Sequence, residues 1–292
     1  MTPPRGSAQL VCTVGEAAAE KVDSPRSLSV LLLHGLTGMP SEMRPIERHI
    51  KALGFEIVTP LLPGHGATHR ELLETTWRDW VDGARRALDD LASRSDSVVV
   101  AGLSMGALLA TLLAAEDPRV AGIALLSPTM RYDGSSIPWT RCLLPLADVF
   151  PFLGKVTYWT ETPPYGLKDE RLQRRITRSV EAAKRGETTQ FGLFRTYSGA
   201  LRELNRLVRE VRVKAGGARC PALVLHSVED TVTSVRNAEE IYALLGATDK
   251  SIQWLSGCDH VITLDLQRHE VARHVGEFVT RLGSPRGQKR RH

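Results

Sequence analysis

A serine held in a glycine-containing turn is the residue of this chain best placed for nucleophilic chemistry. Residues 98–110 read VVVAGLSMGALLA, a β-branched run followed by a small, apolar, helix-like segment. Between the two, Ser104 stands two residues after Gly102 and two before Gly106. This is the G-x-S-x-G pattern of a sharp turn from strand to helix, which exposes the serine hydroxyl. Strand and helix crowd together there, so the residues on either side must lack bulk.

A serine nucleophile calls for a base, and for an acid that orients the base. The hydroxyl reacts poorly until a neighbouring base takes its proton. In a strand-turn-helix site of this kind the chain order is serine, then carboxylate, then histidine. Residues 226–232 read HSVEDTV after an apolar run, and Asp230 is the predicted orienting carboxylate. Glu229 is the alternative acid, whereas Asp259 directly precedes a histidine and is badly placed to orient its own neighbour.

The base is expected in the last loop that follows a strand. That loop reads SGCDHVI and contains one histidine, His260. His34, His65 and His226 also lie at strand ends or in adjoining loops, but each precedes the carboxylate and breaks the expected order. We interpret His34 and His65 as structural groups that hold their loops by hydrogen bonds.

The elements that must position these residues alternate along the chain. Predicted strands cover residues 29–33, 55–59, 98–101, 120–126, 222–225 and 251–255, and predicted helices cover residues 42–53, 77–91, 105–115, 235–245 and 266–282. Apolar strands separated by helices indicate crossover connections, and hence an α/β fold with a mostly parallel, doubly wound sheet. Sites in such sheets lie at the carboxyl ends of the strands, where the candidate residues fall.

One stretch, residues 129–217, interrupts this alternation. It begins with short proline-punctuated segments and continues as two charged, helix-patterned stretches, residues 168–185 and 188–213. We predict a core formed by residues 1–128 and 218–283, an inserted helical cap over residues 129–217, and a basic disordered tail over residues 284–292. Ten of the sixteen aromatic residues lie in the predicted cap. They either line an apolar pocket over the site or form the small core of the cap itself.

Composition limits the classes of function. The chain has 292 residues, of which 42% are hydrophobic and 24% charged, as is ordinary for a soluble globular protein. The net charge of +5 is modest and no basic helix carries interleaved aromatics, so a nucleic-acid partner is not expected. The beginning of the chain lacks the apolar run of a signal peptide, and no segment is apolar for long enough to insert stably in a membrane, which predicts a cytoplasmic protein. We expect a monomer or a homodimer.

The four cysteines lie far apart, without a C-x-x-C pair. Such spacing favours neither a disulfide framework nor a zinc site. The predicted chemistry of the serine also needs no help from a bound group. We therefore expect neither a metal nor an organic cofactor.

Five motifs of the chain occur together in one known superfamily: LLLHGLTG, LPGHG, GLSMGA, the HSVEDTV loop and DHVITLD. With them the chain resembles the α/β-hydrolase superfamily, above all the capped bacterial carboxylesterases and monoacylglycerol lipases grouped with the serine aminopeptidase-like hydrolases. The resemblance covers residues 30–126 and 220–278 and is weak in the predicted cap. The chain departs from it in two places. Ala107 stands where many relatives have a second glycine, and the region before the first strand is short for their leading hairpin.

The resemblance implies a role for each candidate residue. Ser104 falls on the nucleophile, Asp230 on the acid and His260 on the base. The oxyanion formed during acyl transfer would be bound by two backbone N–H groups. One belongs to Met105, the residue after the nucleophile, and the family pattern puts the other at Leu36, in the turn after the first strand.

The predicted function is a two-step acyl transfer to water, with a small apolar ester as the substrate. The expected enzyme is a serine esterase of the carboxylesterase or monoacylglycerol lipase type. A thioesterase, an amidase or an acyltransferase would use the same three residues, and the fold does not choose among them. A ligand-binding or sensing protein on the same fold is the alternative from a different class.

Overall fold

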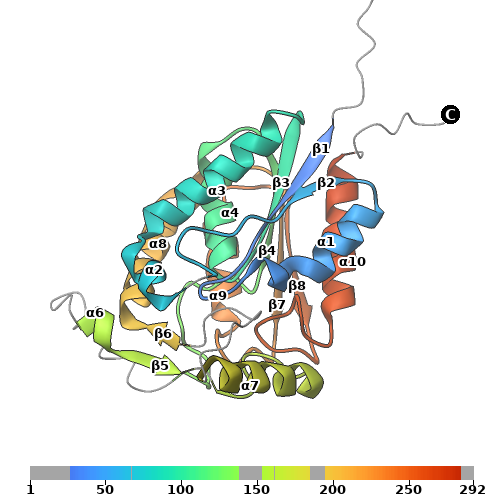
Figure 1. The fold of residues 1–292 in the computed structure, drawn as a ribbon. Helices are drawn as coiled ribbons and strands as arrows, with labels where there is room; N and C mark the ends of the chain where they lie inside the picture. The colour runs from blue at the N-terminus through green and yellow to red at the C-terminus, as the bar shows by residue number, and fades with distance from the viewer. Residues whose placement is uncertain (1–26, 67, 138–152, 161, 185–194, 284–292) are drawn as a thin grey trace, which may run out of the picture.

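The core of the molecule is a six-stranded parallel sheet with the strand order β2-β1-β3-β4-β7-β8 (Figure 1). The computed structural model describes residues 27–66, 68–137, 153–160, 162–184 and 195–283. The strands are β1 (Leu28–Leu33), β2 (Glu56–Val58), β3 (Ser97–Leu103), β4 (Val120–Leu126), β7 (Ala222–Ser227) and β8 (Lys250–Leu255). Each corresponds to a predicted strand, and the predicted doubly wound α/β sheet is confirmed.

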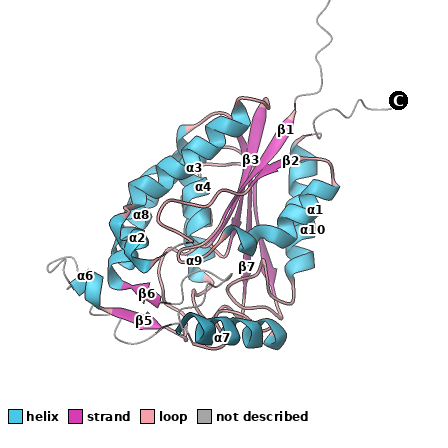
Figure 2. Ribbon diagram, viewed as in Figure 1, coloured by secondary structure: helices cyan, strands magenta, loops and turns pink. Residues whose placement is uncertain are grey.

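Helices cover both faces of the sheet (Figure 2). They are α3 (Trp77–Ala92), α4 (Met105–Glu116), α8 (Ser198–Lys214) and α9 (Arg236–Leu244) on one face, and α1 (Arg44–Ala52) and α10 (Arg268–Leu282) on the other. Side chains of a strand point alternately to the two faces. Leu31 and Leu33 accordingly pack in the larger core cluster with the first group, while Val30 and Leu32 pack with the second. Five of the six residues of β1 are apolar, as expected for a strand buried on both faces, and the small Ser29 is the exception.

Helix α8 lies inside the stretch predicted as the cap, but it packs on the body of the molecule. Its buried side chains, among them Leu204, Leu207 and Val211, belong to the larger core cluster together with those of α3 and α4. The apolar side chains of α8 therefore cover one face of the sheet. A helix of a cap above the site would not contact this face. Among the described residues of 129–217, the segments that stand apart from the layers lie between residues 153 and 197.

Those segments lie near the carboxyl ends of the strands (Figure 1). They include α6 (Leu153–Val156), α7 (Glu170–Lys184) and an antiparallel pair of strands, β5 (Tyr158–Thr160) and β6 (Arg195–Tyr197). The sequence analysis anticipated α7 but missed β5 and β6, because three residues are too few to show an alternating pattern. It also missed α2 (His69–Glu74), which, like the 3-10 helices η1 (Pro40–Met43) and η3 (Ala215–Gly217), is short.

Several predictions concern parts of the chain that the structure does not cover. The basic tail over residues 284–292 and the region before residue 27, which is expected to be short for a leading hairpin, lie outside the described residues. Cys220 and Cys258 are free thiols, and Cys12 and Cys142 lie outside the described residues. In the described ranges, none of the helices combines the length and the apolar character needed to cross a membrane.

Candidate functional site

The predicted turn from strand to helix is present between β3 and α4. Ser104 adopts φ 54° and ψ −111°, a conformation that non-glycine residues rarely occupy. A Cβ on Gly102 would lie 2.1 Å from the carbonyl oxygen of Gly106, and a Cβ on Gly106 would lie 2.3 Å from that of Leu33. Both contacts are too short for real atoms. The two glycines therefore let the helix approach the sheet closely enough to hold Ser104 at the strand end.

Ser104, His260 and Asp230 come from three separate loops and meet at one end of the sheet. The hydroxyl of Ser104 lies 3.2 Å from His260 Nε2. On the other side of the imidazole, Nδ1 lies 2.7 Å from Asp230 Oδ2. All three side chains are buried. In this geometry Nδ1–H donates to Asp230, which leaves Nε2 as an acceptor for the serine proton.

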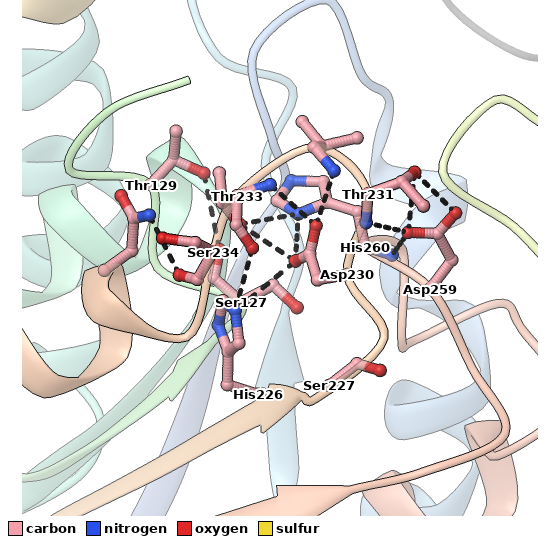
Figure 3. A network of polar contacts seen from close by, with 12 residues as sticks. Ser127, Thr129, His226, Ser227, Asp230, Thr231, Thr233, Ser234, Asp259 and His260 are labelled. Atoms are coloured by element: carbon pink, nitrogen blue, oxygen red, sulfur yellow. Dashed lines mark hydrogen bonds and ion pairs between the residues drawn. The ribbon is translucent and has the colours of Figure 1, made fainter. Parts of the chain in front are cut away.

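The Asp230 carboxylate is held by its own loop (Figure 3). Its Oδ1 accepts hydrogen bonds from the backbone N–H groups of Val232 and Thr233, at 2.8 and 2.7 Å, and its Oδ2 accepts one from the Thr233 hydroxyl at 2.8 Å. Burial raises the pKa of the Asp230 carboxyl, but the charge and hydrogen bond of His260 outweigh burial and hold this pKa below its ordinary value. The carboxylate is thus charged and fixed in direction before any ligand binds.

The electrostatics of His260 suit a base. Burial lowers the pKa of its imidazole, but the charge of Asp230 and the hydrogen bond to it, together with the charges of Asp259 and Glu42, outweigh burial, so this pKa is raised above its ordinary value. A raised pKa means that Nε2 holds a proton more firmly once it has taken one from a neighbouring hydroxyl.

The two other carboxylates near this histidine have different partners. Glu229 forms an ion pair with Lys168 and accepts a hydrogen bond from the backbone N–H of Gly257 at 2.6 Å. Asp259 accepts the backbone N–H of His260 at 2.8 Å and that of Thr231 at 2.7 Å, and so ties two loops together (Figure 3). In the described contacts neither carboxylate reaches the imidazole. Asp230 is the carboxylate that the structure brings to it.

The backbone donors predicted for the oxyanion lie beside the serine. Met105 is the first residue of α4, and the first N–H groups of a helix have no partner within the helix. Leu36 lies in the turn after β1 and borders the same cavity as Ser104. Both residues are buried, and in the described part of the chain neither backbone N–H donates a hydrogen bond. Two buried donors are thus left for a bound group, and their role in binding an oxyanion stays a prediction.

His34 and His65 hold the loops at the strand ends, as expected. Nδ1 of His34 lies 2.9 Å from the Gly35 carbonyl, and its Nε2 accepts the backbone N–H of Leu62 at 3.1 Å. Nδ1 of His65 lies 3.0 Å from the Pro63 carbonyl. Burial lowers the pKa of His34 to about 3 and that of His65 to about 4, so both imidazoles are neutral at ordinary pH.

The sequence analysis missed three side chains that touch the central residues. Thr129 Oγ1 lies 2.8 Å from the hydroxyl of Ser104. His226, set aside because of its place in the chain order, has its Nε2 3.6 Å from Asp230 Oδ2 and 3.2 Å from the Thr233 carbonyl. Thr233 itself bonds Asp230 and could have been found, since a threonine three residues after an aspartate often closes a turn with it. No local pattern points to Thr129 or His226.

A cavity opens beside Ser104 and His260. The described residues that line it are Gly35, Leu36, Thr37, Glu42, Leu103, Ser104, Tyr132, Ser136, Ile137, Thr160, Thr162, Pro163, Pro164, Tyr165, Gly166, Thr196, Val232, His260 and Val261. The described aromatic residues of this stretch have different surroundings. Tyr132 and Tyr165 line the cavity, whereas the rings of Tyr158 and Tyr197 lie 5.0 Å apart, across the β5–β6 pair. The described residues contain no cluster of three or more His, Cys, Asp or Glu side chains placed to hold a metal ion.

Comparison with known proteins links this site to one family. A family model described as serine aminopeptidase, S33, matches residues 24–267. The thermostable monoacylglycerol lipase of Bacillus sp. (strain H-257) is 28% identical over 254 residues, which make up 87% of this chain and 91% of that protein. A carboxylesterase of Bacillus subtilis (strain 168) is 26% identical over 255 residues, or 87% of this chain and 93% of that protein.

Solved structures agree on the fold. The monoacylglycerol lipase of Paleococcus ferrophilus superposes with a TM-score of 0.71 at 18% identity, covering 89% of this chain and 98% of that one. A structure described for LipS and LipT, two metagenome-derived lipolytic enzymes, superposes with a TM-score of 0.69 at 26% identity, covering 88% of this chain and 95% of that one. The predicted α/β-hydrolase fold is confirmed.

Proposed function

The chain belongs to the serine aminopeptidase S33 family, and on that premise we propose that it hydrolyses carboxylic esters with an apolar acyl chain. It is an α/β hydrolase similar to a monoacylglycerol lipase and to a carboxylesterase. The observation that carries the proposal is the line of contacts from the Ser104 hydroxyl through the His260 imidazole to the Asp230 carboxylate. Such a line is what acyl transfer by a serine requires.

In the first step Ser104 attacks the ester carbonyl. His260 Nε2 takes the hydroxyl proton while Oγ forms a bond to the carbonyl carbon, and the carbonyl oxygen becomes an oxyanion. The charge of Asp230 stabilises the imidazolium that results. The tetrahedral intermediate then collapses, the bond to the alcohol oxygen breaks, and His260 returns its proton to the departing alcohol. An acyl group remains on Ser104.

The second step repeats this chemistry with water. His260 takes a proton from a water molecule, whose oxygen attacks the acyl carbon and forms a second oxyanion. Collapse releases the carboxylic acid, and Ser104 regains its proton from His260. The backbone N–H groups of Leu36 and Met105 stabilise both oxyanions. Loss of one such donor typically slows catalysis by about a hundred- to a thousandfold.

The segments that precede α8 form the cap in this proposal. Pro163, Pro164 and Tyr165 from this region and Ile137 from the chain that leads into it line the cavity beside the serine. These side chains supply apolar surface for an acyl chain. Hydroxyl groups from Thr160, Thr162 and Thr196 line the same space, and they suit the more polar alcohol half of an ester.

The proposal is tested with the Ser104→Ala variant and a fluorophosphonate probe. Wild-type protein should hydrolyse p-nitrophenyl hexanoate and label with the probe, whereas Ser104→Ala should do neither. Ser93→Ala is the matched control, since Ser93 lies on the surface at the end of α3 and bonds only the Asp90 carbonyl there. Esterase activity that survives in Ser104→Ala would overturn the assignment of the nucleophile.

A panel of substrates separates ester hydrolysis from its relatives. Acyl-thioesters, anilides and monoacylglycerols with the same acyl chain should be compared with the p-nitrophenyl ester by kcat/KM. If the thioester or the anilide has a higher kcat/KM than the p-nitrophenyl ester, the substrate class is a thioester or an amide, and the proposed mechanism still applies. Tight ligand binding without labelling by the probe would instead identify a binding protein.

A further inference from the structure

Glu42 reaches out of η1 and fills the hollow of the turn that follows β1. The backbone N–H of Gly35 donates a hydrogen bond to its Oε2 at 3.1 Å. A Cβ on Gly38 would lie 2.2 Å from Oε2 and 2.4 Å from Oε1, so the carboxylate occupies the space that a larger residue would need. The turn and the carboxylate fit around each other.

This turn carries one of the two proposed oxyanion donors. The N–H of Gly38 bonds the Gly35 carbonyl at 3.2 Å, and between them lie Leu36 and Thr37. Thr37 adopts a φ of 61°, a left-handed conformation that side chains other than glycine rarely take. A turn held in such a conformation needs support from its surroundings. The bond from Glu42 to Gly35 provides support immediately before Leu36.

The same carboxylate gives the cavity a negative charge. Glu42 lines the cavity together with Ser104 and His260, and no lysine or arginine is among the described residues that line it. Backbone donation to a carboxylate favours its charged form. Glu42 also acts on the imidazole, because burial lowers the pKa of His260 while the charges of Asp230, Asp259 and Glu42 raise it.

We propose that Glu42 makes the site selective by charge: it admits neutral esters, disfavours esters that carry a free carboxylate, and promotes release of the acid product. The inference rests on the proposed ester hydrolysis. That reaction turns a neutral acyl group into a carboxylate at Ser104, so the charge of Glu42 acts on the product and hardly on the substrate. Like charges in a partly buried site repel more strongly than in water. Glu42 is also a positioning residue for the turn that bears Leu36.

Two substitutions separate these roles. Glu42→Gln removes the charge but keeps an oxygen that can accept the Gly35 N–H, whereas Glu42→Ala removes both. Glu47→Gln is the matched control, since Glu47 lies in the first turn of the neighbouring helix α1 and outside the described lining of the cavity. All variants should be compared by thermal unfolding, so that effects on the site are distinguished from loss of the fold.

The measurements use substrates that differ only in charge. Mono-p-nitrophenyl glutarate carries a terminal carboxylate, and p-nitrophenyl pentanoate is its neutral counterpart. In Glu42→Gln, the ratio of kcat/KM for the glutarate to that for the pentanoate should rise about tenfold. The inhibition constant of free pentanoate should fall by a similar factor, and the acid limb of the pH profile should move to lower pH.

In Glu42→Ala, kcat for the neutral ester should fall as well, because the turn loses its support. Unchanged selectivity and unchanged product inhibition in Glu42→Gln would overturn the electrostatic role, and wild-type kcat in Glu42→Ala would overturn the positioning role. A fluorophosphonate probe, which reacts with Ser104 only if the proposed nucleophile is active, distinguishes these outcomes from failure of the proposed function. If Glu42→Gln still reacts with the probe and keeps the wild-type preference for the neutral ester, the result contradicts the role of Glu42 and leaves the proposed ester hydrolysis intact.

Discussion

The hydroxyl oxygen of Thr129 lies 2.8 Å from the hydroxyl oxygen of Ser104, closer than His260 Nε2, which lies 3.2 Å away. Thr129 follows β4 and is completely buried. It is absent from the described lining of the cavity beside Ser104. This contact holds the Ser104 hydroxyl in the rotamer that also faces the imidazole.

We expect Thr129→Val to lower kcat about tenfold with a much smaller change in KM, because it removes one hydrogen bond to the reacting oxygen and keeps the shape of the side chain. Thr129→Ser keeps the hydroxyl and should retain most of the activity. Steady-state kinetics with p-nitrophenyl esters measure both. Equal kcat in the valine and serine variants would show that the hydroxyl plays no part in positioning Ser104.

The raised pKa of His260 predicts the pH dependence of the reaction. Only the neutral imidazole can accept the serine proton, so activity rises as pH increases through this pKa. Burial lowers the pKa of His260, but the charge and hydrogen bond of Asp230, together with the charges of Asp259 and Glu42, raise it by more, which places the acid limb above the ordinary value of 6.5. A kcat/KM profile between about pH 5 and 9 locates the limb. A midpoint at or below 6.5 in the wild type would contradict the assignment.

Asp230→Asn removes the charge that raises this pKa. Burial then dominates, so the acid limb should move to lower pH, while kcat should fall by about ten-thousandfold through loss of the correct tautomer and of charge stabilisation. Glu229→Gln is the control. It changes the adjacent carboxylate, which pairs with Lys168 instead of the imidazole, and should leave the midpoint of the limb in place.

The sheet and the central residues could be predicted because their signals are local. A continuous apolar run such as that of β1 indicates a strand buried on both faces wherever it occurs. The serine turn is encoded in five consecutive residues, and the carboxylate and the histidine each follow a predicted strand in the order that the turn demands. None of these inferences needs knowledge of a distant contact.

Features that depend on contacts between distant segments could not be read in the same way. Charged, amphipathic α8 reads equally well as a cap helix or as a helix on the sheet, and only its packing against α3 and α4 decides. Thr129 and Ser104 are 25 positions apart in the sequence. His226 lies only four positions before Asp230, but its contact with the carboxylate depends on the path of the loop between them. Glu42 looks like an ordinary helical glutamate until the turn after β1 is seen to wrap around it.

The close approach of α4 to β3 predicts a large cost for Gly102→Ala. The new Cβ would lie 2.1 Å from the Gly106 carbonyl, so the backbone of the turn must shift. We expect the free energy of unfolding to fall by about 1–3 kcal/mol, together with loss of activity. Gly216→Ala is the matched control, because the nearest atom to its Cβ would be 3.9 Å away. Chemical denaturation checks both variants, and equal stability would contradict the packing argument.

His34 and His65 should make stability depend on pH. Their pKa values are lowered by burial to about 3 and about 4, whereas unfolded histidines have pKa values of about 6.5. Below about pH 6.5 the unfolded chain takes up protons that the folded chain does not, so stability is complete above that pH and falls as pH drops toward 4. Each histidine contributes a slope of up to about 1.4 kcal/mol per pH unit.

Urea denaturation between about pH 7.5 and 5 measures this slope. His65→Gln should reduce the slope of the free energy of unfolding against pH by the contribution of one histidine, even if the variant is less stable at every pH. His269→Gln is the control, since His269 is an exposed residue of α10. A slope that stays the same in His65→Gln would rule out a neutral, buried His65 as its source.

The buried carboxylate of Asp265 ties the start of α7 to the loop that carries His260. It accepts the backbone N–H groups of Lys168 and Asp169, at 2.9 and 2.8 Å, and that of Asp259 at 2.7 Å. A charged acceptor of several backbone bonds is worth more than a neutral one. If this carboxylate is removed, buried donors on both sides lose their partner, which costs about 1–3 kcal/mol for each group left unsatisfied.

We therefore expect Asp265→Ala to be less stable than the wild type, to exchange the amide hydrogens of α7 faster, and to lose kcat through disorder of the His260 loop. Asp249→Ala, which removes an exposed carboxylate paired with Arg281, should leave all three unchanged. Hydrogen exchange resolved by segment distinguishes local from global effects. Faster exchange confined to α7 and residues 256–266 supports the role of Asp265. Unchanged protection of α7 would mean that other contacts, such as the bond from the Val261 N–H to the Gly166 carbonyl, suffice to hold the helix in place.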